Sequence, residues 1–206
     1  EWGAVGHWEV AQTEWGAPIE HNSSMKAANY LKSYNEVIRP FPEQGIGNYV
    51  FLWGQKQERT PTWYGMFTPT GEETEPVDVM HYVWNDDWPE NRTPTIETME
   101  LNALTAYDNV RLEAGQTYDA QVVSIDHDSD PLTYSWELRH ESTSTESGGA
   151  QEYIPELIQG LIGVIDGPQI RLEAPEEEGA YRLFVYVYDG NNHAAHANIP
   201  FYVTNP

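Results

Sequence analysis

The chain has 206 residues, of which 33 are acidic and 10 are basic, so its formal net charge is -23. A field of this sign repels phosphate backbones and anionic membranes, which makes nucleic acids and acidic membrane surfaces poor partners. The absence of cysteine excludes disulfides and thiolate chemistry, and no apolar run is long enough to span a membrane as a helix. An acidic surface with few lysines suits a secreted or salt-exposed protein.

The first part of the chain, residues 1–102, has the pattern of an α/β fold. Apolar residues recur at helical spacing over residues 24–38, which predicts an amphipathic helix with Ser23 as its N-cap. The unbroken apolar run YVFLW at residues 49–53 suits a strand that is covered on both faces. A second helix is predicted to begin near Thr74. Helix, strand, loop and helix in this order are typical of the closing unit of a (β/α)-type architecture, and they make up only part of a (β/α)8 (TIM) barrel.

The second part, residues 103–206, alternates apolar and polar residues and predicts an all-β domain. About seven strands fit into this length, as in an immunoglobulin-like sandwich, with Trp136 as the core tryptophan. Residues 140–167 are too long for a hairpin loop, and residues 154–162 within them are predicted to form a short helix packed on the sandwich. The strands of this domain are expected near residues 110–113, 117–125, 132–138, 169–173, 181–187 and 195–203.

A carboxylate, a tryptophan and a glycine stand together in the motif EWG, which occurs at Glu1 and again at Glu14. A carboxylate can act as nucleophile or proton donor at a glycosidic bond, and glycine lets the backbone approach closely. The stretches EWGAVGHWEV, TEWGAPIEHNSSMKA and YVFLWGQKQERTPTWYGMF follow one another along the chain. In order and spacing they resemble the last part of a (β/α)8-barrel glycoside hydrolase of the retaining type.

The resemblance implies roles for particular residues and for sequence outside this chain. Glu1 would stand at the end of the seventh barrel strand as the catalytic nucleophile, and Trp53, one strand later, would form an aromatic platform under the sugar. The general acid/base glutamate of the fourth strand would lie in upstream sequence, together with six further strands. We therefore expect the chain to need that barrel segment, from the same or another polypeptide, and to be inactive alone. No cofactor is expected for catalysis.

The loops that follow the two barrel strands supply the candidate substrate-binding residues. Each has a structural alternative: His7 and Trp8 could pack the loop, Glu58 and Arg59 could form a structural network, and a tryptophan is often a core residue. The candidates are Trp2, His7, Trp8, Trp53, Gln55, Trp63 and Tyr64.

A second group of acidic residues predicts a structural calcium site. Asp126, Asp128 and Asp130 alternate in the turn DHDSDP, where their oxygens can converge on Ca²⁺, and Asp189 could add another ligand. The spacing is not that of an EF-hand, and the alternative is a turn held by Asx hydrogen bonds without a metal. The segments DHDSDPLTYSWEL and LFVYVYDGNNHAA resemble a polycystic-kidney-disease (PKD) or cadherin-like sandwich domain.

These features favour a fragment of a secreted glycoside hydrolase that cleaves β-linked polysaccharide with retention of configuration. The alternative is a non-catalytic extracellular module that binds glycan or builds surface structure, and a third interpretation is a spacer without chemistry. The expected partner is a polysaccharide or oligosaccharide. The expected location is outside the cell, at its surface or in the periplasm.

Overall fold

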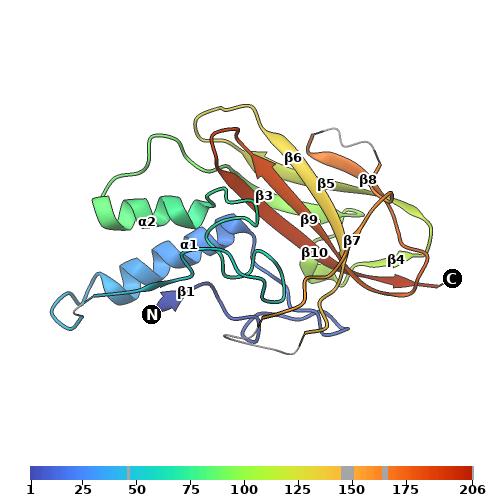
Figure 1. The fold of residues 1–206 in the computed structure, drawn as a ribbon, viewed down its shortest axis with the longest axis horizontal. Helices are drawn as coiled ribbons and strands as arrows, with labels where there is room; N and C mark the ends of the chain where they lie inside the picture. Colours follow the sequence, from blue (N-terminus) through green and yellow to red (C-terminus); the bar gives the residue numbers. More distant parts are fainter. Residues whose placement is uncertain (46, 145–150, 164–166, 206) are drawn as a thin grey trace.

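The computed structural model describes residues 1–45, 47–144, 151–163 and 167–205. Figure 1 shows two helices side by side at one end of the molecule and two β-sheets at the other, so the fold is mostly β. Within the described residues, no helix is long and apolar enough to cross a membrane.

The first part of the chain contains two short parallel strands, each followed by a helix. Strands β1 and β2 pair in parallel, Trp2 opposite Val50, and α1 makes the connection between them. Helix α2 packs on α1. This is the predicted order of elements, although each strand is short. The elements are β1 (Trp2–Gly3), α1 (Ser23–Ser33), a π-helical turn (Tyr34–Ile38), β2 (Val50–Phe51) and α2 (Glu75–Asn85).

Two local predictions in this part differ from the structure. Asn22, not Ser23, caps α1, because its side chain accepts a hydrogen bond from the backbone N–H of Met25 (2.8 Å). The apolar run 49–53 is not covered on both faces, since Tyr49 is 80% and Trp53 is 51% exposed. Among the described residues β1 and β2 form a two-stranded sheet, so no further strand of this sheet covers these rings.

The second part of the chain is a sandwich of two β-sheets. The larger sheet has five strands in the order β4-β10-β9-β6-β7, and the smaller has three in the order β3-β5-β8. Their inner faces share one apolar core, in which Trp136 is buried as predicted. The strands are β3 (Thr95–Leu101), β4 (Arg111–Glu113), β5 (Thr117–Ile125), β6 (Thr133–His140), β7 (Leu157–Ile158), β8 (Gln169–Glu173), β9 (Gly179–Tyr188) and β10 (Ala194–Thr204).

The division of the chain falls one strand earlier than the predicted boundary at residues 102 and 103. Strand β3 pairs antiparallel with β5 and sends Ile96, Met99 and Leu101 into the sandwich core. The sandwich therefore begins near residue 95, and the sequence before it holds the two helices.

The short helix predicted over residues 154–162 is absent from the described structure. Leu157 and Ile158 form β7, which pairs with β6, and Gly163 donates its backbone N–H to the carbonyl oxygen of Arg171 in β8 (2.9 Å). Pro155 and Gly160, the latter at a φ of +84°, interrupt any helix here. The Ser/Thr/Gly-rich stretch 145–150 lies outside the described residues.

The first part of the chain covers the outer face of the five-stranded sheet. Alternate residues of β10 point into the core, while His196 and Asn198 face the opposite way and are still buried. The backbone N–H of His196 donates to Ser23 Oγ of α1 (3.0 Å), and Arg182 of β9 donates to the carbonyl oxygen of Pro18 (2.8 Å). The two parts therefore share a buried interface.

Candidate functional site

A cleft of about 330 Å³ opens beside β1 and brings together several predicted site residues. Glu1, Trp2, Trp8 and Tyr64, which are among the residues predicted for a sugar site, line it. Glu9 adds a second carboxylate, and Glu58, for which the sequence offered a structural network as one alternative, adds a third. The full lining is Glu1, Trp2, Gly3, Ala4, Gly6, Trp8, Glu9, Phe51, Glu58 and Tyr64.

The floor of the cleft depends on a close approach of β1 to β2. A Cβ atom at Gly3 would lie 2.4 Å from the carbonyl oxygen of Phe51, so only glycine fits there. Tyr30 of α1 connects the two strands, because its hydroxyl donates to that same carbonyl oxygen (2.7 Å) and accepts from the backbone N–H of Ala4 (3.1 Å). Burial raises the pKa of Tyr30, so it stays a neutral donor. The apolar repeat over residues 24–38 did not predict that Tyr30 connects the two strands.

A tight turn after β1 presents Trp8 to solvent. Glu9 donates its backbone N–H to the carbonyl oxygen of Gly6 (2.9 Å), and its side chain accepts from the N–H of Gly6 (2.9 Å). A Cβ atom at Gly6 would lie 2.7 Å from the Trp8 ring, so a larger residue here would displace that ring from its present position. Trp8 is 63% exposed as a result. An exposed indole beside carboxylates is suited to stacking on a sugar ring while the carboxylates accept hydrogen bonds from its hydroxyls.

His7 and Trp63 support the cleft from behind and do not line it. The Trp63 ring is buried, and its Nε1–H donates to the carbonyl oxygen of Val5 (2.9 Å). The His7 ring packs edge-on against Trp63 and lies 3.7 Å, Nε2 to Oε1, from Glu58. Burial lowers the pKa of His7, and the nearby charge of Arg59 lowers it further, so the ring is neutral at pH 7. Both residues hold the loop after β1 in place.

The walls of the cleft carry the carboxylate of Glu58 and the hydroxyl of Tyr64, and both groups have partners within the protein. Glu58 is buried and forms an ion pair with Lys56. Burial raises the pKa of Tyr64 to about 12, and its hydroxyl accepts the backbone N–H of His7 (3.2 Å). Arg59 turns toward the second part of the chain, where its backbone N–H donates to Glu152 (2.8 Å).

Trp53 and Gln55 lie apart from the cleft. The Trp53 ring packs against Phe67 (5.3 Å between centroids) and against Trp84 of α2 (5.5 Å). Gln55 donates to the carbonyl oxygen of Pro61 (3.0 Å) and lines a different crevice. The strand register explains why Trp53 does not reach the cleft as predicted, because Gly3 pairs with Phe51 and Trp53 lies beyond the paired segment.

Three of the four predicted calcium ligands converge. One carboxylate oxygen from each of Asp126, Asp130 and Asp189 lies within 4.8 Å of the others. The fourth, Asp128, accepts the backbone N–H of Arg92 (2.6 Å) and is not part of the group. The predicted Asx turn is also present, since Asp126 Oδ1 accepts the N–H groups of Asp128 (2.9 Å) and Asp130 (2.8 Å). Its other oxygen, Oδ2, is buried without a hydrogen-bond partner in the described part of the chain, so the donor set fits a hard cation.

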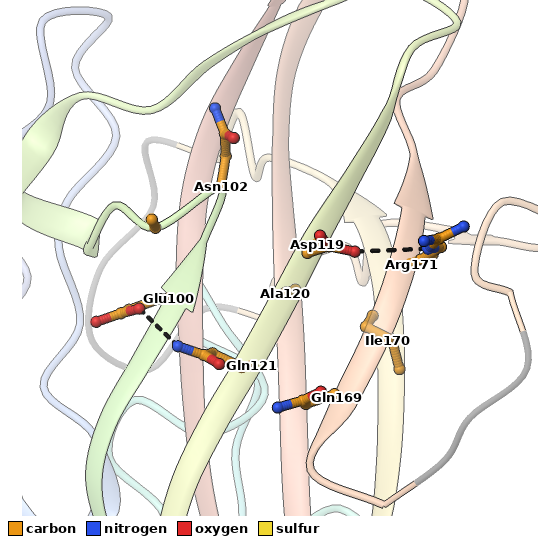
Figure 2. Close-up of a pocket in the computed structure, with 9 residues that line it drawn as sticks. Glu100, Asn102, Asp119, Ala120, Gln121, Gln169, Ile170 and Arg171 are labelled. Carbon is orange, nitrogen blue, oxygen red and sulfur yellow. Dashed lines mark hydrogen bonds and ion pairs between the residues drawn. The ribbon is translucent and has the colours of Figure 1, made fainter.

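A hollow of about 620 Å³ lies on the outer face of the three-stranded sheet (Figure 2). Figure 2 shows two pairs of polar side chains across the strands: Gln121 donates to Glu100 (2.8 Å), and Arg171 lies 3.6 Å from Asp119. No aromatic ring is among its lining residues. The hollow is larger than the cleft beside β1, but four of its polar side chains pair with one another and no ring lines it, so it is a weaker candidate for a sugar site.

No protein-family model and no curated protein matches the chain. Three solved structures are remotely similar, each at 16% identity. The PKD domain of an M14-like peptidase from a Thermoplasmatales archaeon aligns with 55% of this chain and 97% of its own, at a TM-score of 0.32. A nucleoside hydrolase-related protein from Saccharophagus degradans, associated with carbohydrate metabolism, aligns over 69% of this chain but only 34% of its own (TM-score 0.38). A methionine-rich copper resistance protein from Escherichia coli aligns over 54% and 99% (TM-score 0.33).

Proposed function

We propose that this chain is part of an extracellular retaining glycoside hydrolase that cleaves β-linked polysaccharide, with Glu1 as its nucleophile. The composition of the cleft beside β1 carries the proposal. The carboxylates of Glu1, Glu9 and Glu58 line this cleft together with the exposed ring of Trp8. Carboxylates and a stacking ring are the groups that sugar cleavage needs.

The order of elements supports the proposed architecture. Two parallel strands joined by a helix, with a second helix after them, are the repeating unit of a (β/α)8 barrel. The exposed rings of Tyr49, Trp53 and Trp84 lie on this unit, and apolar groups of this size are normally covered. Further βα units, from the same or another chain, would cover them and would supply the general acid/base carboxylate.

In the proposed reaction Glu1 attacks the anomeric carbon and forms a glycosyl ester, while the acid/base carboxylate protonates the departing glycosidic oxygen. Water then gives its proton to that carboxylate and attacks the anomeric carbon, which breaks the bond to Glu1, releases its carboxylate and retains the configuration overall. Such enzymes hold the two carboxyl groups about 5–5.5 Å apart. Trp8 would stack on the sugar ring, and Glu9 and Glu58 would accept hydrogen bonds from its hydroxyls.

One observation favours the alternative that the chain by itself binds glycan without cleaving it. Glu1 is exposed, and no hydrogen bond orients its carboxylate among the described residues. The chain alone should therefore bind sugars in the cleft but not hydrolyse them.

The test is the substitution Glu1→Gln in the longer enzyme that the proposal requires. It should lower kcat by roughly 1,000-fold or more while KM changes little, because the amide keeps the shape but cannot attack. Glu14→Gln is the matched control: Glu14 stands in the second EWG motif, where it pairs with Arg111 (3.1 Å). Turnover by Glu1→Gln within tenfold of the unsubstituted enzyme would contradict the nucleophile assignment.

We also propose that Asp126, Asp130 and Asp189 hold a structural Ca²⁺ between two loops of the sandwich. The ion would bind the unpaired oxygen of Asp126 and screen the repulsion among three carboxylates. Calorimetric titration of the chain with calcium chloride should show saturable heat that Asp130→Asn weakens. The absence of heat at millimolar calcium would leave only the Asx turn.

A further inference from the structure

A second crevice, of about 310 Å³, opens where the loop after β2 meets the outer face of the five-stranded sheet. Both parts of the chain contribute to it, so it exists only because the first part is packed on the sandwich. Its lining residues are Gln55, Gln57, Pro61, Pro69, Thr70, Glu137, Arg139, Ile154, Tyr186 and Tyr188.

The charges in this crevice cancel, and the remaining groups are amides, hydroxyls and flat rings. Arg139 forms two hydrogen bonds with Glu137, from Nε (3.0 Å) and from Nη2 (2.9 Å), so the pair presents no net charge. The rings of Tyr186 and Tyr188 stack with 6.4 Å between their centroids. A neutral ligand that combines hydroxyl groups with an apolar ring face fits this chemistry better than an ion does.

Gln57 is the residue in this crevice whose structural role is unexplained. It is only 9% exposed, and neither its Nε2 nor its Oε1 has a hydrogen-bond partner in the described part of the chain. Burying an unpaired amide is unfavourable, and such a group is expected either to gain a partner or to be replaced by an apolar side chain. An unpaired amide in the wall of a crevice points to a ligand that supplies both a donor and an acceptor, as a pair of sugar hydroxyls does, and the buried amide would meet it by turning into the crevice.

We propose that this crevice is a second glycan subsite, in which the Gln57 amide binds the hydroxyls of a neutral sugar unit beside Tyr186 and Tyr188. The choice of ligand rests on the proposed function, whereas the site rests on its own lining. Gln57 and Glu58 are neighbours in the chain, and they line the crevice and the cleft respectively. A polysaccharide that crosses this loop would be held by both parts of the protein.

Titration of the whole chain with cellohexaose, laminarihexaose and xylohexaose, followed by calorimetry, tests the subsite. Gln57→Leu should weaken the best of these ligands roughly tenfold, which is the value of one to two lost hydrogen bonds. The same substitution should raise the melting temperature by roughly 2–4 °C, because it removes a buried unpaired amide. Gln169→Leu, in the hollow of Figure 2, is the matched control and should leave affinity unchanged.

Trp8→Ala separates this proposal from the proposed function. If Gln57→Leu leaves the affinity within twofold while Trp8→Ala weakens it, the crevice is not a subsite and the cleft beside β1 still is. If Gln57→Leu weakens binding and Trp8→Ala does not, the crevice stands and the cleft loses its support. If none of the three hexasaccharides binds at millimolar concentration, the subsite proposal is overturned, and the kinetics of Glu1→Gln still decide the proposed function.

Discussion

His196 shows how one residue can couple the stability of this fold to pH. It lies on the outer face of β10, 2% exposed, and neither ring nitrogen has a hydrogen-bond partner within the described ranges. Burial lowers the pKa of the ring to about 3, with a further contribution from the positive charge of Lys26, which outweighs the opposing effect of Glu20. His196 is therefore neutral in the folded protein at every pH of physiological interest.

The consequence is a loss of stability on mild acidification. Because the unfolded chain takes up this proton near pH 6.5 and the folded protein only near pH 3, the contribution of His196 is complete above pH 6.5 and is lost as the pH falls toward 3. The slope is at most about 1.4 kcal/mol per pH unit. Urea unfolding at pH 7.5 and 5.0 should show a smaller pH effect in His196→Leu than in the unsubstituted chain.

Other buried groups also titrate in this interval, since burial raises the pKa of Glu75 to about 7 and lowers the pKa of His7 and His21, so it is the comparison with His196→Leu that isolates the histidine. Glu20, whose pKa is lowered to about 2, loses its own contribution only below pH 4.5, under the interval measured. His127 is exposed, so His127→Leu should retain the pH dependence of the original chain. Equal pH effects in His196→Leu and the unsubstituted chain would contradict the assignment.

At the level of elements, α1 is held on β10 by a buried polar network centred on Glu20. The carboxylate lies 2.5 Å from Lys26 Nζ and accepts hydrogen bonds from Asn198 of β10 (2.6 Å), Thr60 (2.6 Å) and Thr62 (2.9 Å). The positive charge of Lys26 and these donors lower the pKa of Glu20 against the opposing effect of burial. Each member depends on the others, because an unpaired charge in this position is strongly unfavourable.

Removing the charge of Lys26 should therefore lower the free energy of unfolding strongly. Lys26→Met leaves the Glu20 carboxylate buried without its counterion, and we expect a loss of about 3–5 kcal/mol in the free energy of unfolding. Lys32→Met, on the exposed side of the same helix, should change it by less than about 0.5 kcal/mol. Urea unfolding at pH 7.5 measures both, and similar effects of the two substitutions would show that the network does not hold α1 on the sheet.

The sandwich illustrates what alternation in sequence can and cannot predict. The pattern in β10 correctly predicted its inward residues, from Ala195 to Val203. The pattern left the environment of His196 and Asn198 on the opposite face undecided, and both are buried under the first part of the chain. Local periodicity assigns a side chain to a face of its strand, but a covering element distant in sequence decides whether that face meets water.

At the scale of the whole molecule, the order of elements was more predictable than their contacts. The parallel pairing of β1 with β2 follows from the predicted strand, helix and strand order, because a helical crossover brings two strands parallel. The place of β3 in the sandwich was missed, since its pairing with β5 is a long-range contact. For the site, the family resemblance implied one set of residues that included Trp53. Glu1, Trp2, Trp8 and Tyr64 of that set line one cleft, whereas Trp53 lies beyond the paired segment of β2, which sequence alone did not reveal.

If Glu1 attacks the sugar, a small external nucleophile should rescue an enzyme that lacks the Glu1 carboxylate. In the longer enzyme that we propose, Glu1→Ala should lose roughly 1,000-fold or more of its turnover of an aryl β-glycoside. Sodium azide should restore part of it by entering the vacated space and forming a bond to the anomeric carbon as the aryl oxygen departs, which gives a glycosyl azide of inverted configuration. Turnover within tenfold of the original enzyme, or a loss that azide does not rescue, would contradict the account.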